Sequence, residues 1–451
     1  MGSRRWLLAV GLAALLAGCG DSGGGETSEE PEPAPDASVE TGSDAAPEAS
    51  AEAAPATSAG AAPAAPGTFN WTLVDTTALY ADDSHALGAA SNGDEVLGVG
   101  YRTGGGAEEI SLAWRTRDGR TWERSELPQP AGVPLGGTNA FAAGAWSGGW
   151  VVAGVVRGDD PTLALWVSAD GATWAAVESP AFAAPEDRLG GVRPSGVAAS
   201  ADAIVVGGSA ETIDEGAAVW RSTDGRAWER VDDDDLRVTF MRDVASDGAG
   251  FVGVGTSIRP DLRNEGVVWR SEDGTDWRRV ASPALGAGGE DVSLEAVAHG
   301  DGRWWIAGHQ LIGDPADASS QEAALAVWSS ADGETWEREP QDAMPYDLDV
   351  EVDDVAALPG GAVVVIGTST DPSLSHPAAV SWTRAADGTW RQQAGGALEG
   401  NGSVTGNGVA ALGDVPVALG TTVILDEPGE EDDGGVLNYD AVAFVGSPLT
   451  G

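Results

Sequence analysis

Short apolar runs separated by polar turns recur along residues 68–447, four to each repeat. In the third repeat these runs are Val197–Ala199, Ala203–Gly208, Ala217–Ser222 and Ala227–Val231. Asp224-Gly225 stands between the last two, and such a pair tolerates the positive φ that a two-residue hairpin turn requires. The runs are apolar and β-branched rather than strictly alternating, which is typical of strands covered on both faces. The pattern predicts blades of four antiparallel strands.

A pair of tryptophans marks six of the repeats. Each copy has a Trp, a short polar stretch ending in Asp-Gly, and a second Trp. The first Trps lie 52, 54, 49, 59 and 54 residues apart. A period of this size indicates a solenoid or a propeller. The pairs are Trp114 and Trp122, Trp166 and Trp174, Trp220 and Trp228, Trp269 and Trp277, Trp328 and Trp336, and Trp382 and Trp390.

The two ends of the repeat region complete each other. The second apolar run of the repeat unit occurs seven times. The third run also occurs seven times, and its last copy, Ala441–Gly446, has Phe444 in place of the Trp. Its fourth run is missing at the C-terminal end and is found instead at the N-terminal end, as Phe69–Val74. Closing the ring in this way removes exposed sheet edges. The sequence therefore predicts an all-β, seven-bladed β-propeller over residues 68–447, followed by a tail of residues 448–451.

The paired motif, S/T-x-D-G-x-x-W, resembles the Asp-box (BNR-like) repeats of bacterial sialidases and of the photosystem II stability factor family. It differs by one residue between Asp and Trp, and the sixth copy is shifted by one further residue. In those families the motif is a structural turn opposite the active-site face. The resemblance implies this role for Asp118, Asp170, Asp224, Asp273, Asp332 and Asp387.

The N-terminus has the features of an export signal. In residues 1–18 two arginines precede an apolar run, Trp6–Leu16, that is too short to span a bilayer. Leu16-Ala17-Gly18-Cys19 resembles the lipobox of prokaryotic lipoproteins, which implies that Cys19 is lipidated and anchors the protein to the cell membrane, facing outside the cytoplasm. Because Cys19 is the single cysteine, an intramolecular disulfide is excluded. Ser3–Leu7 resembles a twin-arginine signal, so both that route and the Sec route stay open.

Composition limits the partners of the chain. Residues 19–67 are rich in Ala, Pro, Gly and Glu, which predicts a disordered acidic tether. The formal net charge is −47, and all 24 basic residues are Arg. This balance argues against nucleic acid as a partner, because phosphates require clustered cations. Two explanations of the acidity stay open: adaptation to a saline habitat or a GC-rich genome, and an acidic face for cations or a basic partner.

The lengths of the connections indicate which face carries function. If the strands of a blade are called A to D, the A–B and C–D turns share one face, and the B–C and D–A connections share the other. The first set is short and uniform, whereas the second is long and variable. Variable loops on a rigid scaffold are the usual form of a binding site. The long connections include Val231–Met241, Ile258–Gly266, Gln310–Ala324, Glu339–Val350 and Thr421–Asp440.

The sequence therefore predicts a monomeric, non-catalytic binding or assembly module for an envelope protein or glycan. Candidate binding residues on the long-loop face are Arg102, Arg157, Arg242 and the acidic run Asp232, Asp233, Asp234 and Asp235. A second acidic run spans Asp426–Asp433. Neither run has the alternating spacing of a calcium loop, so both are interpreted as solvated loops, and no metal or cofactor is expected.

The alternative is a sialidase-like glycoside hydrolase of the cell envelope. The resemblance to sialidases implies three converging arginines and a tyrosine activated by a glutamate. Arg193 and Arg259 join the three arginines above as candidates, and the tyrosines are Tyr80, Tyr101, Tyr346 and Tyr439. The four histidines are expected at the surface, although His309 and His376 could approach each other as a metal pair; the other two are His85 and His299. The residues alone assign no catalytic group.

Overall fold

The computed structural model of this protein describes most of the repeat region. The described residues are 69–74, 78–79, 83–104, 108–158, 161–183, 191–210, 216–237, 239–261, 263–286, 290–312, 322–340, 349–370, 376–394, 398, 403–425 and 437–448. The predicted export signal, Cys19, the tether and the acidic run Asp426–Asp433 lie outside these residues.

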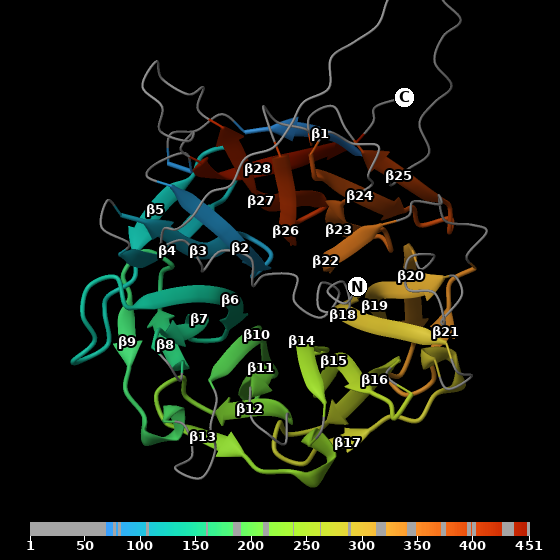
Figure 1. Ribbon diagram of the computed structural model, residues 1–451, viewed down its shortest axis with the longest axis horizontal. Coiled ribbons are helices and arrows are strands. Elements are labelled where there is room, and N and C mark those ends of the chain that lie inside the picture. The colour runs from blue at the N-terminus through green and yellow to red at the C-terminus, as the bar shows by residue number, and fades with distance from the viewer. Residues whose placement is uncertain are drawn as a thin grey trace, which may run out of the picture. The chain divides into compact units, whose positions relative to one another are not determined.

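Seven antiparallel sheets of four strands each surround a central axis (Figure 1). The first three blades are β2 (Ser84–Ser91), β3 (Val96–Thr103), β4 (Glu109–Thr116) and β5 (Glu123–Glu126); β6 (Thr138–Trp146), β7 (Gly149–Val156), β8 (Thr162–Ser168) and β9 (Ala175–Val177); and β10 (Val192–Ala199), β11 (Ile204–Ala210), β12 (Gly216–Ser222) and β13 (Trp228–Val231).

The remaining blades repeat this order from the axis outward. They are β14 (Phe240–Ser246), β15 (Phe251–Ile258), β16 (Asn264–Ser271) and β17 (Arg278–Arg279); β18 (Asp291–Gly300), β19 (Arg303–Ile312), β20 (Glu322–Ser330) and β21 (Glu337–Arg338); β22 (Val350–Ala357), β23 (Val363–Ser369), β24 (Ala378–Arg384) and β25 (Trp390–Ala394); and β26 (Ser403–Leu412), β27 (Val415–Leu425), β28 (Leu437–Pro448) and β1 (Phe69–Leu73). Three short 3-10 helices precede inner strands: η1 (Pro180–Phe182), η2 (Asp234–Leu236) and η3 (Pro283–Leu285).

The N-terminal strand closes the ring. β1 is the outer strand of the seventh blade and pairs antiparallel with β28, with Phe69 opposite Pro448 and Leu73 opposite Phe444. Trp71 is buried, and its Nε1 donates a 2.9 Å hydrogen bond to Ser381 Oγ in the sixth blade. The predicted seven-bladed propeller and its closure by the N-terminal strand are confirmed.

Apolar side chains fill seven layers, each shared by two neighbouring blades. Between the first two blades, Leu97 and Val99 pack with Trp150, Val152 and Trp166. Each middle strand lies between two such layers, so both of its faces are buried. This accounts for runs such as that of β7, which are apolar at nearly every position.

Several of the predicted long connections are partly strand, among them Ile258–Gly266, where β16 begins at Asn264. β19 continues to Ile312 and β20 begins at Glu322, within the expected loop Gln310–Ala324. β27 likewise continues to Leu425. The added residues are mostly apolar or β-branched, and their backbone groups extend the same antiparallel ladders.

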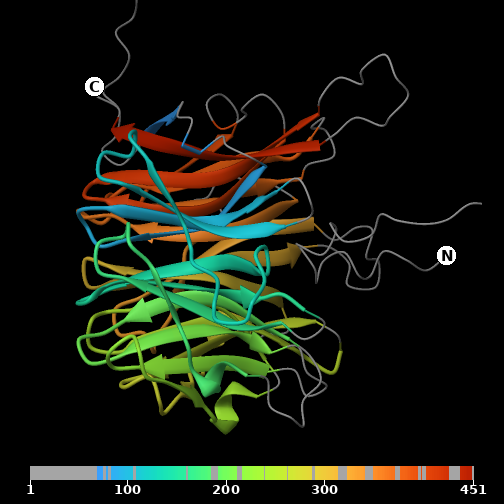
Figure 2. The ribbon, with the colours of Figure 1, turned by 90° about the vertical axis from the view of Figure 1, so that its left-hand side faces the viewer.

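Every inner strand carries a β-bulge at the same place. The A strands run between the two faces of the ring (Figure 2). Each is interrupted about three residues from its start, toward the long-loop face, where one residue has no partner on strand B. A bulge bends a strand and redirects a side chain. The seven bulge residues are Leu87, Phe141, Ser195, Arg242, Glu295, Asp353 and Asn407, named here the bulge ring.

A glycine on strand B faces each bulge because a larger residue has no room there. A Cβ at Gly367 would lie 2.1 Å from the backbone oxygen of Glu351, and one at Gly255 would lie 1.8 Å from that of Phe240. Backbone atoms cannot yield as a flexible side chain can. These are the glycines that end the second run of the repeat: Gly100, Gly154, Gly208, Gly255, Gly308, Gly367 and Gly420.

We predict that Gly367→Ala destabilises the protein by about 1–3 kcal/mol, because the new methyl group overlaps the backbone of strand A. Urea unfolding followed by tryptophan fluorescence measures the change. Gly158→Ala is the matched control, since a Cβ there meets nothing within 4 Å, and it should change stability by less than about 0.5 kcal/mol. Equal effects of the two substitutions would contradict the proposed crowding.

Candidate functional site

The bulge ring borders a cavity on the axis of the propeller. The cavity has a volume of about 370 Å³, and all seven bulge residues line it. The rest of its wall is mainly Ala, Gly and Val from the second halves of the inner strands. The ring residues are half-buried or exposed, so their side chains contact water inside the cavity. One residue from each blade therefore sets the charge and the width of the cavity where the bulge ring lines it.

The ring divides into two arcs of different chemistry. Leu87, Phe141 and Ser195 come from the first three blades and form an uncharged arc, named here the apolar arc after its two large members, Leu87 and Phe141. Blades four to seven contribute the polar arc: Arg242, Glu295, Asp353 and Asn407. Consecutive blades are neighbours around the axis (Figure 1). The residues of the apolar arc therefore lie across the cavity from those of the polar arc.

Glu295 is the centre of the charges in the polar arc. Its Oε2 lies 3.6 Å from Arg242 Nε, and its Oε1 lies 3.8 Å from His309 Nδ1. Two basic groups therefore flank one carboxyl group. In the same arc, Thr368 Oγ1 donates a 3.3 Å hydrogen bond to Asp353 Oδ2.

Asp353 is in a different electrostatic state. Burial, and after it the charge of Glu351, raise the pKa of Asp353 well above its usual value. The pKa of Glu351 is also raised, chiefly by burial and further by Glu295, although His309 opposes the shift. The polar arc therefore holds one ion-paired carboxylate and, beside it, carboxyl groups that retain protons more readily.

Two further aspartates join neighbouring blades beneath the ring. Asp354 Oδ2 accepts a 2.8 Å hydrogen bond from the Val409 N–H of the next blade, and Asp243 Oδ2 accepts one of 2.9 Å from Val297 N–H. Burial raises the pKa of Asp354 to about 7, against the effect of its two backbone donors. Burial, reinforced by the charge of Asp354, raises the pKa of Asp243 well above its usual value.

We predict that Asp354 makes stability fall as pH rises from about 4 to about 7, because a raised carboxyl pKa in the folded state favours the protonated form. The contribution is at most about 4 kcal/mol, and cavity water reduces it. Asp354→Asn keeps an acceptor for Val409 N–H and should flatten this part of the curve in urea unfolding.

The control for this measurement is Asp202→Asn, which changes an exposed aspartate in the turn between β10 and β11. Its pH curve should keep the slope of the unaltered protein, which includes the repulsion between the many surface acids. If Asp354→Asn has that same slope, the buried carboxyl group does not contribute.

The structure separates the five candidate arginines. Arg242 is the one among them that lines the cavity. Each of the five has its own nearby partner. The pairs are Arg102 with Glu126 at 3.0 Å, Arg157 with Glu109 at 3.3 Å, Arg242 with Glu295 at 3.6 Å, Arg259 with Asp261 at 3.4 Å, and the Arg193 guanidinium 5.3 Å from the Phe141 ring centre. The described residues thus contain no cluster of three arginines free to bind a carboxylate.

The acidic run Asp232–Asp235 lies beside the fourth blade's outer strand. Asp233 caps η2 and also accepts a 2.9 Å hydrogen bond from Trp277 N–H. The backbone oxygen of Asp235 accepts 2.8 Å and 2.9 Å hydrogen bonds from Trp269 Nε1 and Arg279 Nε. Asp232 and Asp234 each pair with Arg237. These contacts connect the third blade to the fourth, away from the residues that line the cavity.

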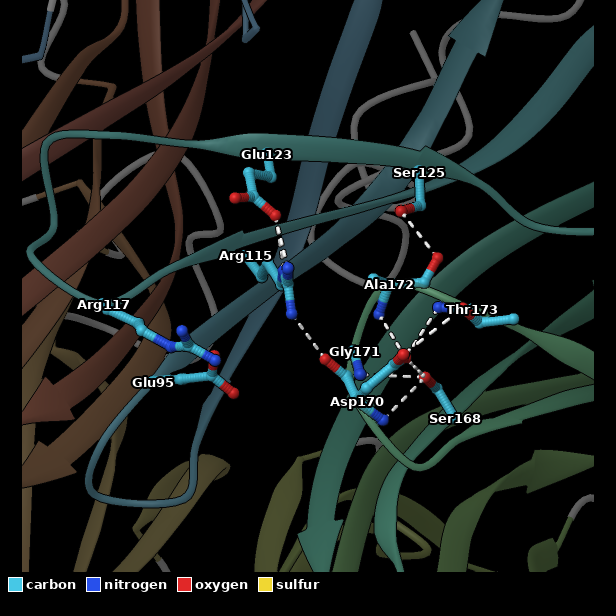
Figure 3. Close-up of polar contacts among 10 residues, drawn as sticks. All are labelled: Glu95, Arg115, Arg117, Glu123, Ser125, Ser168, Asp170, Gly171, Ala172 and Thr173. Atoms are coloured by element: carbon cyan, nitrogen blue, oxygen red, sulfur yellow. Dashed lines mark hydrogen bonds and ion pairs between the residues drawn. The ribbon is translucent and has the colours of Figure 1, made fainter.

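The Asp-Gly motifs lie at the blade ends opposite the bulges. Figure 3 shows Asp170, whose Oδ1 accepts hydrogen bonds from Ala172 N–H at 2.9 Å and Thr173 N–H at 2.7 Å. These backbone donors, Thr173 first, lower the pKa of Asp170 to about 2. Arg115 of the first blade donates to the Asp170 carbonyl at 2.7 Å. Asp118, Asp224, Asp273 and Asp332 accept the same pair of backbone bonds, and Asp387 accepts one from Thr389.

An aromatic cluster lies near the apolar arc. The ring centres of His85 and Tyr101 are 4.7 Å apart, and those of His85 and Tyr439 are 4.5 Å apart. Burial lowers the pKa of His85 to about 4 and, together with Glu109, raises the pKa of Tyr101 to about 12. The tyrosine is therefore poorly prepared to act as a nucleophile. Tyr80 and Tyr346 lie outside the described residues.

The bulge ring itself was not expected from the sequence, although a signal for it exists. A run of small residues follows each bulge, for example Gly196-Val197-Ala198-Ala199 and Asp354-Val355-Ala356-Ala357. The residue just before the run differs in size and charge from blade to blade. That variability, together with the glycine that ends each second run, marks the position.

Comparison with known proteins gives structural similarity without a family assignment. No family model matches the chain, and no curated protein matches it. Among solved structures, it is similar to the phage phi92 endosialidase (TM-score 0.44, 10% identity, 84% of this chain and 69% of that one). It is also similar to a Penicillium chrysogenum α-L-arabinanase (0.42, 13%, 85% and 98%) and to Trypanosoma rangeli sialidase (0.45, 13%, 83% and 59%). The neighbours thus include the sialidase-type propellers that the repeats resemble, and at these values they assign no activity.

Two further properties concern the described residues alone. None of their helices is long and apolar enough to cross a membrane. No group of three or more His, Cys, Asp or Glu side chains among them is arranged to hold a metal ion.

Proposed function

We propose that this protein recognises carbohydrate at the bulge ring, as a binding module held outside the cytoplasm by lipidated Cys19. The supporting observation is that an apolar arc and a polar arc face each other across one cavity. A sugar ring has C–H groups on its faces and hydroxyl groups at its edges, so it needs both kinds of surface at once. The cavity, at about 370 Å³, has the volume of a small-molecule site.

The two arcs have distinct parts in this proposal. Leu87 and Phe141 supply an apolar surface for the face of a sugar ring. Glu295, Asp353 and Asn407 supply oxygens and an amide for the hydroxyl groups. The Asn407 amide already donates a 2.6 Å hydrogen bond to Ala86 O, which fixes its orientation. Because these groups project from bulges in paired strands, they need little reorganisation on binding.

We predict that the propeller binds oligosaccharides and that Phe141→Ala weakens the binding about tenfold or more, since the apolar arc loses its aromatic ring. A glycan array followed by titration calorimetry of the best ligands measures this. Leu135→Ala is the control, because it removes an exposed apolar side chain from a loop and should leave affinity unchanged. The absence of any bound glycan would refute the proposal.

Hydrolysis of the bound sugar is the second candidate function, and the unequal carboxyl groups of the polar arc favour it. A glycosidase needs a protonated carboxyl group and an ionised one on the two sides of the bond to be cleaved. Asp353 would donate its proton to the leaving oxygen. Glu295, which pairs with Arg242, would act on the anomeric carbon or activate water. Sialic acid is not favoured as the substrate, because the arginines do not converge.

If hydrolysis occurs, Asp353→Asn and Glu295→Gln should each lower kcat by about 10²-fold or more, because each removes a proton-transfer or charged group. Reducing-end release from the oligosaccharides found on the array provides the assay. Asp202→Asn serves as the control and should retain full activity. Binding without product release would leave the protein as a recognition module.

A further inference from the structure

The acids around the cavity outnumber the bases that can neutralise them. Glu295 and Asp353 line the cavity, and Glu351 lies on β22 opposite Thr368, the residue that donates a hydrogen bond to Asp353. The bases on this side are Arg242 and His309. Both bases lie beside Glu295, at 3.6 Å and 3.8 Å. Within the described part of the chain, Asp353 and Glu351 have no arginine partner. The two bases therefore stand beside Glu295, and Asp353 is without an arginine beside it among the described residues.

Among the described residues that line the cavity, one further base is present, His299, and it interacts with Asp247. Beneath the ring, Asp243 and Asp354 add further acids, and their partners are backbone N–H groups. Across the cavity, the Arg193 guanidinium lies over the Phe141 ring, 5.3 Å from its centre. The positive charge of Arg193 therefore lies beside the apolar arc, whereas acidic groups are in excess on the side of the polar arc.

We propose that the ligand is a carbohydrate bearing a protonated amino group, which binds between Asp353 and Glu351. This inference rests on the proposed carbohydrate site and names its ligand class. An ammonium group has three donors and one positive charge, which matches two carboxyl groups that have no arginine partner among the described residues. A neutral sugar offers no positive charge to these carboxyl groups, and an anionic sugar would be repelled by their ionised forms.

As the cation that binds these carboxyl groups, an amine is favoured over a metal ion. The described residues do not gather three or more ligating side chains of the metal-binding types. The same cavity also has an apolar wall that suits the carbon skeleton of an amino sugar and offers nothing to a bare ion. In the absence of ligand, protons on the carboxyl groups reduce the repulsion; when an ammonium group binds, it stabilises their ionised forms and releases protons to the buffer.

The test compares a glucosamine tetramer with its fully N-acetylated counterpart by titration calorimetry at about pH 6, where the amino groups carry protons. The full chain should bind the amine form about tenfold or more tightly, with net proton release seen as a dependence of the enthalpy on the buffer. Asp353→Asn and Glu351→Gln should each remove most of the preference, whereas Asp202→Asn and Glu272→Gln, at exposed turns, should keep it. Circular dichroism verifies folding of each variant.

Each outcome bears on one of the two proposals. Equal binding of the two tetramers overturns the amine inference and leaves the carbohydrate site intact. Preference for the amine form that survives both cavity variants also overturns it, because the charge would then be recognised elsewhere. Binding of neither tetramer, with other glycans bound on the array, rejects the amine class alone. Tight binding of the amine form, lost in the variants, supports it.

Discussion

The close approach of seven inner strands around one axis is the constraint on which the other features depend. At each bulge the backbone of strand A presses against strand B, where any residue larger than glycine would overlap it. The residue after the bulge contacts the next blade: a Cβ at Gly88 would lie 2.7 Å from Phe141 O, whereas Asp354 instead reaches Val409 N–H. The bulge is therefore fixed by packing on two sides. Its extra residue is free to vary, because it faces water.

The residues that stabilise the propeller are therefore different from the residues that face the cavity. Buried Trp side chains and the Asp-Gly turns hold the blades together at the layers between them and at the short-turn face. β1 completes the seventh sheet, so the ring has no open gap between its first and last blades. With these contacts supplied elsewhere, the bulge ring carries Arg242, Glu295 and Asp353 at positions where a charge has little effect on packing. Such an arrangement allows the chemistry of the cavity to change without altering the blades.

The protein contains two groups of aspartates whose pKa values are shifted in opposite directions. The turn aspartates, such as Asp170, accept backbone hydrogen bonds at the surface and have a lowered pKa. The cavity aspartates have raised pKa values, chiefly because of burial. The overall acidity of the chain therefore gives no guide to the charge at the site. Local enclosure decides whether a carboxyl group keeps its proton, and it creates the unequal pair that a ligand would meet.

The sequence by itself determined the blade count, the strand pairs and the closure by Phe69–Val74, because these follow from a repeated hydrophobic pattern and one missing run. It also located the turn aspartates, which interact mainly with residues two or three positions away. Of the candidate site residues, it selected Arg242 but grouped it with Arg102 and Arg157, whose partners are other surface acids. Glu295, Asp353 and Phe141 were not found. Only the tertiary structure could bring them together, since a bulge is a register shift between strands and a ring joins residues about fifty positions apart.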